Sequence, residues 1–92
     1  MPLLTAAQVT EKLAAMPAWQ LAGINIERTV TFPDFPSAIA FVNRVAEAAE
    51  KANHHPDIDI RWNKVRLALS SHDTGGLTQR DFSLAGVIDS LV

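Results

Sequence analysis

Hydrophobic and polar positions alternate along a stretch that begins just after Gly23. One parity carries Ile24, Ile26, Val30 and Phe32, and the other carries Asn25, Glu27, Thr29 and Thr31. This period of two is typical of a β-strand with one buried face and one solvent-facing side. Arg28 lies on the apolar parity and is a local exception. A shorter strand, begun by Trp19 and Leu21 and turning at Ala22-Gly23, is expected before it.

The same alternation returns later in the chain and predicts a second pair of strands. The outgoing strand has Ile58, Ile60 and Trp62 on one parity and Asp57, Asp59 and Arg61 on the other, and the returning strand carries Val65, Leu67 and Leu69. We expect a tight hairpin at Asn63-Lys64, because asparagine tolerates a positive φ.

Apolar residues at helical spacing predict three helices. Thr5 is suited to cap the first, with a glutamine three positions later completing a capping box. Either Asp34 or Ser37 caps the second, and Thr78 caps the third, with Asp81 placed well for the helix dipole. The buried stripes are expected to be Val9, Leu13 and Met16; Ile39, Val42, Ala46 and Ala49; and Phe82, Ala85, Ile88 and Leu91.

The order of these elements, αββαββα, predicts an α+β fold. Two hairpins suggest a four-stranded antiparallel sheet, with three helices packed on one face of it. At 92 residues, the chain is expected to form a single domain spanning 1–92. In this arrangement the end of the second helix and the end of the fourth strand lie close together, at the rim of the sheet.

Composition narrows the classes of function. A net charge of −2, with scattered Lys and Arg, gives no electrostatic footprint for nucleic acid. No apolar run approaches the ~20 residues that span a bilayer, and the start of the chain lacks the pattern of a signal peptide. Without cysteine there are no disulfides or thiolate metal sites, so we expect a cytoplasmic protein. Its small core favours oligomer formation.

All three histidines fall between positions 54 and 72. His54 and His55 precede a proline at the end of the second predicted helix, and His72 follows the fourth predicted strand. Because histidine gives and takes protons near neutrality, the cluster is a candidate proton-transfer site. A solvated helix end, with His72 paired to Asp73, is the plainer interpretation. Three histidines can also hold zinc, although this spacing lacks the regular pattern of helical zinc sites.

Five segments together resemble the signature of the pterin-4a-carbinolamine dehydratases. They are Glu50-Lys51-Ala52-Asn53-His54-His55-Pro56, Trp62-Asn63-Lys64-Val65, Leu69-Ser70-Ser71-His72-Asp73, Gly76-Leu77-Thr78, and Arg80-Asp81 continuing to Leu84-Ala85. Members of that family have the αββαββα order. They dehydrate 4a-hydroxytetrahydropterins to quinonoid dihydropterins, recycling the cofactor of aromatic amino-acid hydroxylases.

The resemblance implies a site without metal or cofactor. It makes His54, His55 and His72 the catalytic trio, and it suggests as substrate-binding neighbours Glu50, Pro56, Trp19 and Asp81. Two positions depart from the pattern of animal members: Asn53 replaces an aspartate, and Ile58 replaces an aromatic residue. Any role for a carboxylate at the first position is therefore lost, and the pocket wall at the second is altered.

The chemistry suits histidines that titrate near neutrality. Loss of water from C4a needs a proton delivered to the departing hydroxyl and a proton removed from N5, and two imidazoles can do both. Our hypothesis is that His54 and His72 exchange these protons while His55 holds the pterin ring.

The resemblance also implies a pterin substrate and a homodimer or homotetramer, and neither a nucleic acid nor a membrane is an expected partner. Two alternatives have a different physiological role. One is a non-catalytic interaction or dimerisation partner of a regulator, since animal relatives also bind a transcription factor. The other is a related enzyme of molybdopterin metabolism.

Overall fold

A computed structural model describes residues 2–92 of the chain. The elements are α1 (Ala6–Ala14), β1 (Gln20–Ala22), β2 (Asn25–Thr31), α2 (Phe35–Ala52), β3 (Asp57–Arg61), β4 (Lys64–Leu69) and α3 (Gln79–Leu91). The predicted order αββαββα is therefore confirmed. Within residues 2–92, no helix is both long and apolar enough to cross a membrane.

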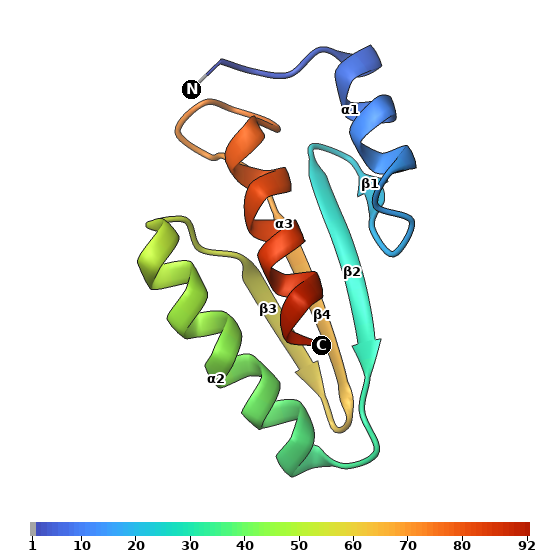
Figure 1. The fold of residues 1–92 in the computed structure, drawn as a ribbon, viewed down its shortest axis with the longest axis vertical. Coiled ribbons are helices and arrows are strands. Elements are labelled where there is room, and N and C mark those ends of the chain that lie inside the picture. Colours follow the sequence, from blue (N-terminus) through green and yellow to red (C-terminus); the bar gives the residue numbers. More distant parts are fainter. Residues whose placement is uncertain (1) are drawn as a thin grey trace.

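The four strands form one antiparallel sheet in the order β1-β2-β4-β3. The central pair is β2 and β4, in a register that places Val30 opposite Val65. Helices α2 and α3 lie side by side across one face, and α1 lies beyond β1 at one end of the molecule (Figure 1). Strand β3 is left at an edge, so its outer backbone groups have no neighbouring strand within the described chain.

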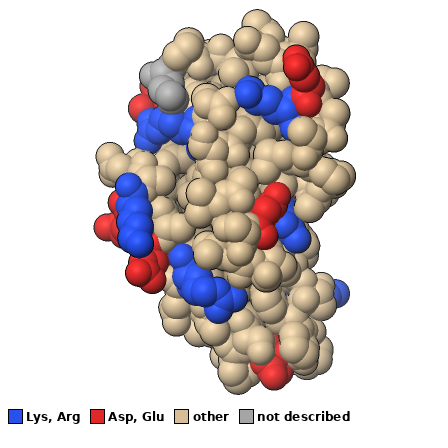
Figure 2. All heavy atoms as spheres, viewed as in Figure 1, with Lys and Arg blue, Asp and Glu red and all other residues tan. Residues whose placement is uncertain are grey.

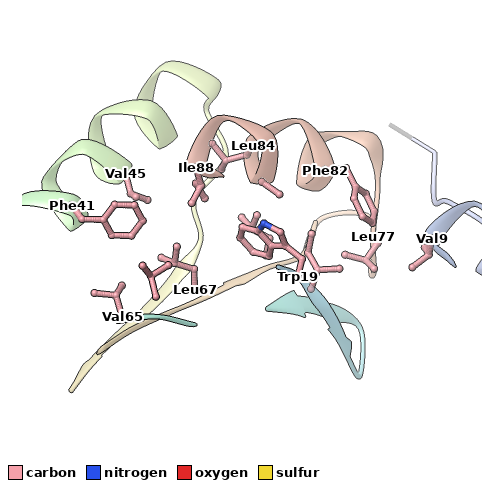
Figure 3. Close-up of a cluster of buried hydrophobic side chains, with 14 of the residues drawn as sticks. Val9, Trp19, Phe41, Val45, Val65, Leu67, Leu77, Phe82, Leu84 and Ile88 are labelled. Carbon is pink, nitrogen blue, oxygen red and sulfur yellow. The ribbon is translucent and has the colours of Figure 1, made fainter. Parts of the chain in front are cut away.

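The core fills the space between the helices and the sheet. Figure 3 shows side chains from α2 and α3 meeting side chains of β4, with Val9 of α1 at the far end. Among the fully buried residues are Phe41, Val45, Val65, Leu67 and Ile88. Ile24 was predicted on the buried face but is 58% exposed, because it lies in the turn between β1 and β2.

The β3–β4 hairpin turns one residue earlier than the sequence predicted. Trp62 and Asn63 form the turn, and Lys64 is already in β4, paired with Arg61. The positive φ belongs to Trp62, at 52°, and Trp62 is 71% exposed instead of continuing the apolar side of the strand. The asparagine serves another purpose: Asn63 Nδ2 donates to the carbonyl oxygen of Phe32 at 2.8 Å and so anchors the turn.

The position of Arg28 on the apolar parity is explained by an acidic partner on the covered face of the sheet. Its guanidinium forms an ion pair with Asp89 of α3, and the same carboxylate accepts a hydrogen bond from Trp19 Nε1 at 2.8 Å. In Figure 3 the indole nitrogen of Trp19 is turned towards α3. Because a charge under a helix is tolerated only when it is paired, Asp89 allows an arginine on the apolar parity.

The predicted caps of all three helices are present. Thr5 and Thr78 each form a capping box with the residue at the third helical position. Of the two candidates for the second helix, Asp34 is the cap, and its carboxylate accepts from the Ser37 backbone N–H at 2.8 Å. These caps fix where α2 and α3 begin, and α3 begins next to the candidate site.

We predict that Asp34→Ala destabilises the protein at neutral pH, whereas Asp34→Asn, which keeps a side-chain oxygen, preserves the cap. Hydrogen bonds with the side chain and then the backbone of Ser37 hold the pKa of Asp34 below its ordinary value of 3.8. The carboxylate's stabilisation is therefore complete above the unfolded pKa and is lost as pH falls through the lower folded pKa. Urea unfolding of wild type and Asp34→Ala should show a difference in free energy that shrinks on acidification; a constant difference would contradict this.

Candidate functional site

The histidine pair begins at the end of α2, where the chain makes a left-handed turn. Asn53 is the C-cap, with φ 49° and ψ 44°, and asparagine is one of the few residues that adopt this conformation readily. The turn is fixed by the His54 backbone N–H, which donates to the carbonyl of Ala49 at 3.1 Å. It sends the two neighbouring rings to different surroundings: His54 is buried and His55 is exposed.

His54 is held by a fully buried carboxylate. Its Nε2 lies 2.5 Å from Oδ1 of Asp81, and neither side chain has appreciable exposure. The other oxygen of Asp81 accepts from the Ser71 hydroxyl at 3.0 Å and from the Thr78 backbone N–H at 2.9 Å. Because a carboxylate only accepts, His54 presents a protonated Nε2 to it. Nδ1 is therefore the ring nitrogen of His54 that this contact leaves able to accept a proton.

The loop that carries His72 is tied to the same carboxylate. Ser71 precedes His72, and its hydroxyl bonds both Asp81 and the Thr78 hydroxyl, the latter at 2.8 Å. The Ser71 backbone pairs with Gly76 and closes a short loop in which Gly75 has φ 83°. His72 lies at the start of that loop with its side chain exposed. Sequence reasoning missed Ser71, whose signal was a hydroxyl at the end of a buried strand, directly before a histidine.

His55 has an acidic partner of its own. Its Nε2 contacts a carboxylate oxygen of Glu50, and both side chains are exposed. The partner lies one helical turn earlier, so the contact orients the ring at the end of α2. Pro56, which lies between His55 and β3 in the sequence, is partly buried. Glu50 thus contacts His55, and the substrate-binding roles of Glu50 and Pro56 stay predictions.

A groove runs between α2 and α3, with a volume of about 690 Å³. Its apolar residues include Ala48, Leu84, Val87 and Leu91, and its polar residues include Arg44, Glu47, Lys51 and Arg80, with His54 contributing to the wall. Basic and acidic side chains are interspersed over the face shown in Figure 2, so no field of one sign covers it. Among residues 2–92, no group of three or more histidine, aspartate or glutamate side chains is placed to hold a metal ion.

Comparison with known proteins identifies the family of this chain. The family model described as pterin 4 alpha carbinolamine dehydratase matches residues 2–91. The chain belongs to that family. A relative from Acidobacterium capsulatum, provisionally named a pterin-4-alpha-carbinolamine dehydratase, is 59% identical over 92 residues, covering all of both chains. A relative from Chloroflexus aurantiacus with the same provisional name is 55% identical and covers 100% of this chain and 99% of its own.

Solved structures agree with the family in fold. A transcriptional coactivator/pterin dehydratase from Brucella melitensis has a TM-score of 0.91 and 32% identity, with 96% of each chain covered. A pterin dehydratase-like protein identified as a RuBisCO assembly factor in the α-carboxysome has a TM-score of 0.65 and 20% identity, covering 79% of this chain and 84% of its own. At 20% identity, the second structure supports only the similarity of fold.

Within this family fold, two of the expected pocket neighbours lie in very different places. Asp81 is bonded directly to His54. Trp19, by contrast, is 3% exposed in the core, and its N–H is committed to Asp89, near the opposite end of α3. No hydrogen bond or ion pair among residues 2–92 joins Trp19 to a histidine. Its role as a substrate contact stays a prediction.

Proposed function

We propose that this chain dehydrates 4a-hydroxytetrahydropterins to quinonoid dihydropterins and so recycles the cofactor of aromatic amino-acid hydroxylases. The observation that carries the proposal is the buried pair of His54 and Asp81, linked through Ser71 to the loop of His72. Membership of the pterin carbinolamine dehydratase family supplies the substrate class. The His54–Asp81 pair can transfer protons, and dehydration of this substrate class requires proton transfer.

The proposed step breaks the C4a–O bond and the N5–H bond. His54 takes the N5 proton at Nδ1, and its charged ring is stabilised by Asp81. His72 delivers a proton to the departing hydroxyl, which leaves as water, and the electron pair of the former N5–H bond forms the N5=C4a double bond. His72 is exposed, so it can be reprotonated from solvent after each turnover. His55, oriented by Glu50, holds the ring of the substrate.

The test is an assay with freshly generated 4a-hydroxytetrahydropterin, following formation of the quinonoid product. The spontaneous reaction in buffer is the reference, and a variant with all three histidines replaced is the control. We expect the wild-type protein to raise the rate above that reference and the control to match it. A wild-type rate equal to the spontaneous one would refute the proposed function. Profiling other pterins, including molybdopterin precursors, would then identify a related substrate.

We also propose that the chain forms a homodimer or homotetramer through the free edge of β3. Antiparallel pairing of two β3 strands centred on Asp59 would place Asp57 of one copy opposite Arg61 of the other, and Ile58 opposite Ile60. Opposite charges and apolar side chains at facing positions stabilise such a pair. The two Asp59 carboxylates would face each other at the centre, and Arg66 of the same chain offsets the charge of each. The half-exposed Ile58 and Ile60 would gain cover.

Ile58→Lys is therefore expected to shift the protein towards the monomer, because it places a charge in the paired edge. Sedimentation velocity should give a multiple of the chain mass for wild type and a smaller mass for the variant. Ala14→Lys, exposed on α1, is the control with the same gain of one positive charge. A wild-type protein that sediments as a monomer would contradict the proposal.

A second role is favoured by one relative. The Brucella melitensis protein is described as a transcriptional coactivator as well as a pterin dehydratase. If this chain also acts on a regulator, binding should survive replacement of all three histidines, because the exposed surfaces would be unchanged. Retained binding with abolished dehydration would separate the two roles.

A further inference from the structure

Arg80 lies at the second position of α3, directly before Asp81, and its side chain reaches two other segments. Nη2 donates to the carbonyl oxygen of Asn53 at 2.9 Å, and Nη1 lies 3.6 Å from Oδ2 of Asp73. Asn53 immediately precedes His54, and Asp73 immediately follows His72. One guanidinium therefore spans both histidine-bearing segments.

The contact with Asn53 is well suited to an arginine. The carbonyl belongs to the C-cap of α2, where the last carbonyl groups lack helical N–H partners and favour a positive charge. The planar guanidinium carries donors in fixed directions, so one side chain can serve two acceptors, which the single ammonium of lysine does less well. The Arg80 side chain is 31% exposed, and Asp73 is 70% exposed. Exposed ion pairs contribute little to stability. The contacts of Arg80 are therefore better explained as fixing the positions of the two segments than as stabilising the fold.

We infer that Arg80 is a positioning residue that sets the separation between the His54 turn and the His72 loop. The inference rests on the proposed function, in which these two rings act on one substrate. Asp81 joins the same two segments from the buried side, through His54 and Ser71. The first turn of α3 thus holds both segments by two independent sets of contacts, one buried and one near the surface. Arg80 itself takes no part in the proton transfers.

Arg80→Ala is expected to lower kcat for dehydration by about 10–100-fold, because a displacement of ~1 Å between acid and base is enough for such a loss. KM should change less than kcat, and the melting temperature should stay close to that of wild type. Amide hydrogen exchange should accelerate at residues 72–75. Arg80→Lys should recover part of the rate, and it serves as the readout if the alanine variant does not fold.

Arg66→Ala is the matched control. Arg66 also forms two ion pairs, with Glu27 and Asp59, but on the strands of the sheet away from the histidines. It is expected to leave kcat and the exchange of residues 72–75 unchanged. A folded Arg80→Ala with wild-type kcat and unchanged exchange would overturn the inference.

The two proposals fail in distinguishable ways. An inactive wild-type protein refutes the dehydratase assignment. In that case the exchange measurement still decides whether Arg80 holds the His72 loop.

Discussion

His54→Gln is expected to reduce kcat for dehydration by about 10²–10⁴-fold, the usual contribution of a positioned acid or base. Glutamine is chosen because its amide can still donate to the buried Asp81, whereas alanine would leave that carboxylate without its donor. The variant therefore removes proton exchange while keeping the buried hydrogen bond. KM should rise only modestly, because in our proposal His55 is the residue that holds the ring.

The measurement is the initial rate with freshly generated 4a-hydroxytetrahydropterin, corrected for spontaneous dehydration. Asn43→Ala changes an exposed residue of the same helix that does not line the groove, and it should behave as wild type. Turnover of His54→Gln close to that of wild type would refute the role of His54 in proton transfer.

Asp81→Asn is expected to suppress the proposed dehydration by changing the tautomer of His54. In wild type all three groups around Asp81 donate to it: His54 Nε2, the Ser71 hydroxyl and the Thr78 N–H. An asparagine can satisfy Ser71 and Thr78 with its oxygen only by turning its NH₂ towards His54. That arrangement makes Nε2 an acceptor and places the proton on Nδ1, where the wild-type ring would accept one. We expect a loss of kcat similar to that of His54→Gln.

The comparison with Asp81→Ala separates chemistry from stability. Alanine leaves His54 Nε2 and the Thr78 N–H without their acceptor, and each such loss costs about 1–3 kcal/mol. The Ser71 hydroxyl keeps its bond to the Thr78 hydroxyl. Asp81→Ala should therefore be strongly destabilised in urea unfolding, whereas Asp81→Asn should lose far less stability. Nitrogen-15 NMR of the His54 ring would report the tautomer directly. An Asp81→Asn variant with the wild-type tautomer and wild-type turnover would contradict the mechanism.

Local rules were enough to predict most of the fold. The capping signals at Thr5, Asp34 and Thr78 act within one helical turn, so the sequence near each cap determines where the helix begins. Alternation likewise located the strands, because one face of the sheet is buried by helices. The predictions were wrong where the structure depends on contacts between residues that are distant in sequence. The hairpin turned early because Asn63 is bonded to Phe32, a contact that no local pattern reveals.

The candidate site was only partly predictable for the same reason. The types and spacing of His54, His55 and His72 pointed to proton transfer, whereas Glu50 was proposed as a neighbour only through the family resemblance. The cap at Thr78 was foreseen, and Asp81 was first interpreted from the residues as a cap alone. Its bond to His54 spans 27 positions, and it exists because α3 packs against α2. Arg28 and Trp19 both contact Asp89 because α3 also lies over the sheet, and these contacts too join positions that are distant in sequence.

The most direct test of the central claim is whether the three imidazoles meet one pterin. Wild-type protein labelled with nitrogen-15 in its histidine rings would be titrated with a stable dihydropterin that lacks the 4a-hydroxyl. We predict that the ring signals of His54, His55 and His72 all shift, with a single common dissociation constant. A His72 signal that stays fixed while the ligand saturates the other two would contradict the proposed site.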